Sequence, residues 1–158
     1  MNGRMQDKVV MVMGAGSVGP GWGNGRAIAV RMVEEGARVM AFDIALERLE
    51  ETVSRAEAVR DQHGGDIATG TCDVRSNPSI AEAVALTLET FGRIDVLVNN
   101  VGGSAAGGPV EMSEEVWDSQ VDYNLKSVFL TCKHALPHMV SAGRGAIVNM
   151  ASTSGIRW

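Results

Sequence analysis

The chain has 158 residues and a formal net charge of −5 at pH 7, with 45% hydrophobic and 21% charged residues. This composition is ordinary for a globular protein. The acidic balance argues against a nucleic-acid surface, which needs clustered lysine and arginine. No apolar run reaches the roughly 18 residues of a membrane-spanning helix. Two cysteines, Cys72 and Cys132, lie within apolar segments, so we expect reduced thiols and a cytoplasmic protein.

Strand and helix patterns alternate along the whole chain. Apolar runs predict strands at 8–14, 38–43, 67–74, 94–100 and 146–150. Helical spacing of apolar residues predicts helices at 24–37, 46–65, 77–92 and 113–141. Asn77 is the expected N-cap of the third helix, with Pro78 at its first position. The alternation predicts one α/β domain over residues 1–158, a doubly wound Rossmann-like parallel sheet with helices on both faces.

The first predicted strand runs into the glycine-rich segment GAGSVGPGWGNGRAIA, residues 14–29. Glycines let the backbone approach a pyrophosphate, and the following helix offers N–H groups and the positive end of its dipole. Asp43 ends the second strand, where a carboxylate can accept hydrogen bonds from adenosine ribose hydroxyls and would repel a 2′-phosphate. The pattern indicates a dinucleotide site that favours NAD, with NADP the weaker candidate.

Further segments follow the ends of the later strands: CDV at 72–74, IDVLVNNVGG at 94–103, YNLKSVF at 123–129 and GAIVNMASTSG at 145–155. Together with the glycine loop, they resemble the N-terminal, cofactor-binding part of the short-chain dehydrogenase/reductase family. The resemblance covers essentially the whole chain. It implies an oxidoreductase that moves hydride between nicotinamide and an alcohol or ketone substrate, in an enzyme that forms homo-oligomers.

The resemblance also implies residues that contact the cofactor. Gly14, Gly23 and Gly25 correspond to the three family glycines. Asp73 and Val74 correspond to the pair that flanks the adenine, with Asp73 accepting from its exocyclic amine. The remaining implied contacts are those of the glycine loop and of the turn near the nicotinamide ribose: Ser17, Asn24, Asn99, Asn100 and Gly102.

The glycine loop departs from the family pattern. Eight residues, 15–22, separate Gly14 from Gly23, where the family has three, so the loop carries an insertion. Trp22 lies in this insertion. An aromatic side chain can bury area in either of two roles, so Trp22 either covers the cofactor or shields the loop.

The resemblance implies only part of a catalytic set. Ser152 corresponds to the family serine that steadies the substrate oxygen, and Ser154 is a weaker candidate. Asn124 corresponds to a helix asparagine that holds water in a proton relay. The family's acid/base tyrosine belongs to a Tyr-x-x-x-Lys pair, whereas Tyr123, the only tyrosine here, is followed four residues later by Ser127.

The missing pair predicts an incomplete chain. We expect that the domain is incomplete at the C-terminus, that the family's last strands and helices are absent, and that the 158 residues alone are inactive. One alternative is a non-catalytic nucleotide-binding protein complete at Trp158. Another is an S-adenosylmethionine methyltransferase, which would not explain NNVGG, Asn124 and Ser152 together. His134 and His138 have no evident third ligand, so no metal site is expected.

Overall fold

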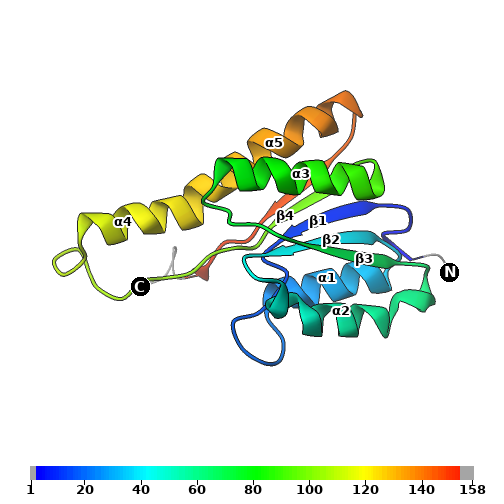
Figure 1. Ribbon diagram of the computed structural model, residues 1–158, viewed down its shortest axis with the longest axis horizontal. Coiled ribbons are helices and arrows are strands. Elements are labelled where there is room, and N and C mark those ends of the chain that lie inside the picture. The colour runs from blue at the N-terminus through cyan, green and yellow to red at the C-terminus, as the bar shows by residue number, and fades with distance from the viewer. Residues whose placement is uncertain (1–2, 154–158) are drawn as a thin grey trace.

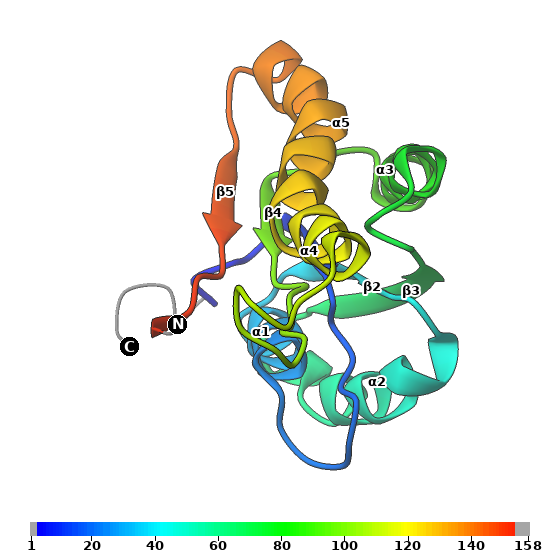
Figure 2. The ribbon, with the colours of Figure 1, turned by 90° about the vertical axis from the view of Figure 1, so that its left-hand side faces the viewer.

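The computed structural model describes residues 3–153. In this range it contains five parallel strands in the order β3-β2-β1-β4-β5: β1 (Val9–Met13), β2 (Arg38–Asp43), β3 (Asp66–Thr71), β4 (Val96–Asn99) and β5 (Ala146–Asn149). The α-helices are α1 (Asn24–Glu34), α2 (Glu50–Glu57), α3 (Asn77–Phe91), α4 (Glu114–Val121) and α5 (Ser127–Ser141). Helices α1 and α2 cover one face of the sheet, and α3 and α5 cover the other (Figures 1 and 2). The predicted doubly wound Rossmann-like fold is confirmed.

The central strand β1 is buried along its whole length. Its side chains alternate between the two faces, as the strand repeat requires. Met11 and Met13 pack into the cluster under α3 and α5, whereas Val10 and Val12 pack into the cluster under α1 and α2. Two covered faces explain why the sequence shows a continuous apolar run and no alternation.

Two details of the predicted helices are wrong. The segment 46–65 is not one helix, because a 3-10 turn at Leu46–Leu49 precedes α2 and another at Arg60–Gln62 follows it. The N-cap of α3 is Ser76 instead of Asn77: the Ser79 N–H donates to Ser76 Oγ at 3.4 Å. Asn77 already belongs to the helix, and its Oδ1 lies 2.8 Å from His134 Nε2 on α5.

The long helical stretch predicted at 113–141 is continuous but not uniform. A π-helical turn at Asp122–Lys126 joins α4 to α5. Such turns insert one extra residue and are frequent at functional sites. At residues 3–153 no helix combines the length and apolar character needed to cross a membrane.

Candidate functional site

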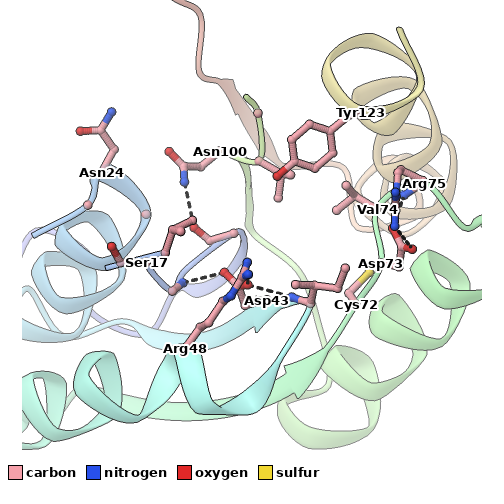
Figure 3. A pocket seen from close by; sticks show the side chains of 18 of the residues that line it. Ser17, Asn24, Asp43, Arg48, Cys72, Asp73, Val74, Arg75, Asn100 and Tyr123 are labelled. Carbon is pink, nitrogen blue, oxygen red and sulfur yellow. Dashed lines mark hydrogen bonds and ion pairs between the residues drawn. The ribbon is translucent and has the colours of Figure 1, made fainter. Parts of the chain in front are cut away.

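A cleft of about 530 Å³ opens at the carboxyl end of the sheet, the edge where parallel sheets bind their ligands. Its lining includes every predicted cofactor-binding residue except Asn99: Gly14, Ser17, Gly23, Asn24, Gly25, Asp43, Asp73, Val74, Asn100 and Gly102. Figure 3 shows that the labelled side chains come to this cleft from separate segments of the chain. The fold therefore brings together predicted cofactor contacts that lie up to 88 positions apart, since Gly14 and Gly102 both line the cleft.

The turn after β1 packs tightly against its neighbours. Gly14 has φ +79°, a left-handed conformation that favours glycine. The Gly14 N–H donates to the Phe42 carbonyl at 2.8 Å, and Asn100 Nδ2 donates to the Gly14 carbonyl at 2.8 Å. A Cβ on Gly25 would lie 1.8 Å from the Gly14 carbonyl oxygen. Glycine at Gly25 is thus what lets α1 start directly on this turn.

The first turn of α1 faces the cleft and has no side-chain cap. Gly23 is the N-cap, in an extended conformation, and it cannot supply a side-chain acceptor. Gly23, Asn24 and Gly25 all line the cleft. A helix N-terminus of this kind offers N–H donors and a partial positive charge to an anion. The uncapped turn therefore has the shape and charge to hold the diphosphate of a dinucleotide.

Asp43 lies at the end of β2, and its carboxylate is held beside the turn that follows β1. Its Oδ2 accepts from the Gly16 N–H at 3.1 Å and its Oδ1 from the Ile44 N–H at 2.9 Å. A Cβ on Gly16 would lie 2.8 Å from Asp43 Oδ2, so only glycine allows this approach. Arg48 Nη1 lies 3.6 Å from Asp43 Oδ1. The carboxylate is oriented by the backbone and has lone pairs left for ribose hydroxyls.

The inserted loop extends toward α2 (Figures 1 and 2), although its residues 16–18 still line the cleft. The Trp22 ring stacks with the Arg55 guanidinium, whose central carbon lies 4.3 Å from the ring centroid. Trp22 is absent from the cleft lining. Buried Arg26 contacts the Gly21 carbonyl and Glu51 Oε2 and fixes the end of the loop. The stack with Arg55 on α2 therefore favours the role of shielding the loop.

Asn99 points away from the cleft. Only 5% of its surface is exposed, and it is hydrogen-bonded to α5 and β5. Its Oδ1 accepts from Thr131 Oγ1 at 2.7 Å, and its Nδ2 donates to Asn149 Oδ1 at 2.8 Å. Leu97, two residues earlier, packs on the same face, as the strand repeat requires. Asn99 ties β4 to its neighbours, and of the two asparagines only Asn100 lines the cleft.

The predicted catalytic residues lie in two different elements. Asn124 is in the π-helical turn, where its Oδ1 accepts from the Gly103 N–H at 2.9 Å and its Nδ2 donates to the Gln120 carbonyl at 3.0 Å. It therefore anchors the turn that follows β4. Ser152 is exposed and lies just after β5. Ser154 falls outside the described residues.

The cleft lining also contains side chains that the sequence assigned to no site, among them Arg48, Arg75 and Tyr123. Arg75 is paired with Asp73, as its Nη2 lies 2.8 Å from Asp73 Oδ2. Tyr123 packs beside Gly103, where a Cβ would lie 3.1 Å from the Tyr123 ring. The sequence could have indicated these residues only by proximity, because each lies within five positions of a predicted site residue. Proximity alone cannot say which way a side chain points.

Comparisons with known proteins match this geometry. The family model for short chain dehydrogenase matches residues 8–157. The 3-oxoacyl-(acyl-carrier-protein) reductase of Thermotoga maritima is 37% identical over 153 residues, which are 97% of this chain and 58% of that protein. The chain thus spans less than two thirds of that relative's length.

Solved structures of short-chain dehydrogenases superpose on this chain. A Burkholderia xenovorans protein described as a short-chain dehydrogenase/reductase superposes with a TM-score of 0.93 at 51% identity, over 99% of this chain and 60% of its own. Carveol dehydrogenase from Mycobacterium avium, in complex with NAD, gives 0.86 at 32% identity, over 99% of this chain and 58% of its own. A metagenomic short-chain oxidoreductase in complex with NADP gives 0.83 at 34%, over 94% and 63%. From its fold, its cleft and these matches, the chain belongs to the short-chain dehydrogenase family.

Proposed function

We propose that the protein is an NAD-dependent oxidoreductase that transfers hydride between nicotinamide and an alcohol or ketone substrate. One observation carries the proposal: the uncapped, glycine-built start of α1 and the Asp43 carboxylate line the same cleft. An anion-binding helix end beside an acid at the end of β2 suits a diphosphate joined to an unphosphorylated ribose. Membership of an oxidoreductase family supports the same reaction class.

Each part of the cleft has a role in this proposal. The amides at Gly23–Gly25 hold the diphosphate, Asp43 accepts from the adenosine ribose hydroxyls, and Asp73 accepts from the adenine amine. Val74 lies against the adenine, and Asn100 and Gly102 pass near the nicotinamide ribose. When bound, the cofactor supplies the carbon that gives or takes hydride. Ser17 and Asn24 complete the cofactor contacts.

The substrate's oxygen needs groups that hold it and move its proton. Ser152 steadies that oxygen by hydrogen bonding, and Asn124 holds water in the proton relay. A family acid/base tyrosine lies in a Tyr-x-x-x-Lys pair, and Tyr123 with Ser127 four residues later is not such a pair. We therefore expect residues 1–158 alone to bind NAD without turnover. Binding without turnover in the whole protein would favour a non-catalytic nucleotide-binding role.

NAD is proposed over NADP because of Asp43. Its carboxylate would lie beside a 2′-phosphate and repel it, whereas it accepts hydrogen bonds from free hydroxyls. Related structures contain both cofactors, so the preference rests on the residues of this chain. Arg48, 3.6 Å from the carboxylate, offsets part of that negative charge.

We also propose a homo-oligomer in the cytoplasm. The long helical segment α4–α5 exposes large apolar side chains, with Trp117 and Phe129 each 62% exposed and Leu125 68% exposed. Large exposed apolar side chains along one helical segment are a feature of interaction surfaces. Cys72 and Cys132 are free thiols, as a reducing compartment favours.

Titration calorimetry with NAD and NADP tests the proposal on wild type and Asp43→Ala. The wild type should bind NAD more tightly than NADP, and Asp43→Ala should weaken NAD binding by about tenfold because charge-assisted hydrogen bonds to the ribose are lost. The preference over NADP should shrink in the same variant. Asp61→Ala, which removes an exposed carboxylate outside the cleft lining, is the matched control for charge.

Two results would contradict the assignment. Unchanged affinities for both cofactors in Asp43→Ala would remove the ribose role. Displacement of NAD by S-adenosylmethionine at comparable concentration would instead favour a methyltransferase. NADH formation from a panel of alcohols, measured by absorbance with the whole protein, then tests hydride transfer itself.

A further inference from the structure

Within residues 3–153, the hydrogen bonds to the carboxylate of Asp73 come from Arg75. Arg75 Nε donates to Asp73 Oδ1 at 2.9 Å and Nη2 donates to Oδ2 at 2.8 Å, so the two groups form a bidentate pair (Figure 3). The Arg75 backbone N–H also donates to Oδ1, at 3.0 Å. The Asp73 backbone is fixed in turn, because its N–H donates to Ser79 Oγ at 3.1 Å. Both residues line the cleft.

The carboxylate of Asp73 can accept more hydrogen bonds than Arg75 donates to it. Each carboxylate oxygen accepts about two hydrogen bonds. Oδ1 has two donors, Nε and the backbone N–H of Arg75, and is filled. Oδ2 has one donor among the described residues, Nη2 of Arg75. One acceptor position therefore remains, on an oxygen whose orientation Arg75 fixes.

The pair has little to do with holding the fold together. The side chains of Arg75 and Asp73 are 47% and 35% exposed, and they lie two residues apart. Partly exposed ion pairs of this kind add little to stability because solvent screens them and ordering opposes them. The hydrogen bond from Arg75 also lowers the pKa of the Asp73 carboxyl, so the acceptor stays ionised at neutral pH.

Acidic residues make the neighbourhood negative. A hollow adjoining the cleft is lined by Asp73, Glu115, Asp118 and Asp122, together with two serines. Arg75 is the only cationic side chain in that lining. Its guanidinium therefore both clamps Asp73 and offsets the charge around it, at the point where the cleft and the hollow meet.

We propose that Arg75 is a positioning residue that aims Asp73 Oδ2 at the exocyclic amine of the cofactor's adenine, and so makes the cleft select adenine over purines without that amine. The inference rests on the proposed function, which places adenine beside Asp73. Hypoxanthine carries a carbonyl oxygen where adenine carries the amine. That oxygen cannot donate to Oδ2 and would be repelled by it, so the selectivity comes from hydrogen bonding and charge.

The test compares NAD with nicotinamide hypoxanthine dinucleotide, the analogue that lacks the amine. Dissociation constants of both are measured by titration calorimetry for wild type, Arg75→Gln and Arg75→Lys. The wild type should prefer NAD by about tenfold, the size expected for one hydrogen bond to a charged group. Arg75→Gln should abolish most of this preference by weakening NAD binding, while affinity for the analogue is retained. Arg75→Lys should behave similarly, because an ammonium cannot clamp both oxygens.

Arg48→Gln is the matched control, since Arg48 lines the same cleft at its ribose end. It should keep the wild-type preference for NAD over the analogue. A preference that survives in Arg75→Gln, with NAD still bound, would overturn the positioning role and leave the proposed function intact. A preference that survives only in Arg75→Lys would overturn the clamp in favour of charge alone. A wild type that binds neither dinucleotide would overturn both proposals.

Discussion

The two ends of α1 satisfy their backbone groups in opposite ways. At the N-terminus, Gly23 supplies no side-chain acceptor and the first turn faces the cleft. At the C-terminus, Gly36 adopts φ +92°, and its N–H and that of Ala37 donate to the carbonyls of Val33 and Met32 at 2.9 Å. The carbonyls at the C-terminal end of α1 are thus satisfied within the protein, by a C-cap with glycine in the left-handed conformation.

The difference supports the proposal that the N-terminal end of α1 binds a ligand. Every helix leaves N–H groups without partners in its first turn and carbonyls without partners in its last. In helix α3, the side chain of Ser76 accepts a hydrogen bond from an N–H of the first turn. Helix α1 instead presents its first turn to a cleft. Substitutions at its N-terminus should therefore change ligand binding, and substitutions at its C-terminus should change stability.

Gly25→Ala should have the largest effect. The new Cβ would lie 1.8 Å from the Gly14 carbonyl oxygen, so α1 must move off the turn that lines the cleft. We expect NAD affinity to fall by about a hundredfold, or roughly 2.8 kcal/mol. Titration calorimetry measures it, with circular dichroism to confirm that the variant is folded. Gly19→Ala is the control in the same loop, where a Cβ meets nothing within 4 Å. A folded Gly25→Ala protein with wild-type affinity would contradict the assignment.

Gly36→Ala should have the opposite effect to Gly25→Ala, lowering stability while NAD affinity is retained. Alanine is strained at φ +92°, and its Cβ would lie 3.0 Å from the His63 carbonyl oxygen. We expect the free energy of unfolding to fall by about 1–2 kcal/mol, with NAD affinity retained at temperatures where the variant is folded. Urea denaturation measures the change. Gly92→Ala, at φ +79° with open space around it, isolates the backbone strain and should lose less. A loss of NAD affinity in folded Gly36→Ala would break the division between the two ends.

The smallest effect concerns pH and Glu35, which follows α1 directly. Hydrogen bonds from the Arg4 side chain and backbone lower the pKa of the Glu35 carboxyl from 4.5 to about 2. Because the folded pKa lies below the unfolded one, the contribution to stability is complete above pH 4.5 and is lost as the pH falls toward 2. The stability curves of wild type and Glu35→Gln should converge over that window. Carbon NMR titration of the carboxyl checks it, and a midpoint near 4.5 would contradict the ion pair.

Much of the fold could be predicted from the sequence, and so could the gathering of most of the predicted cofactor contacts in one cleft. Buried strands and amphipathic helices have local patterns, and chain order with right-handed crossovers then places their ends together. Errors occurred at element ends, such as Ser76 in place of Asn77 as the cap of α3. At a helix end, neighbouring residues of similar chemistry can each serve as the cap. A shift of one residue in where the helix begins determines which side chain reaches the free N–H.

The sequence by itself determined that glycines surround the start of α1, that Asp43 ends β2 and that the chain alternates strand with helix. Only the tertiary structure decided that Asn99 bonds to Thr131 whereas Asn100 reaches Gly14, since the sequence predicted a cofactor contact for both. It also decided that Trp22 stacks on Arg55. Sequence patterns determine which face of a strand or helix a side chain lies on. The residues that it contacts on that face come from elements distant in the chain, so only the tertiary structure determines them.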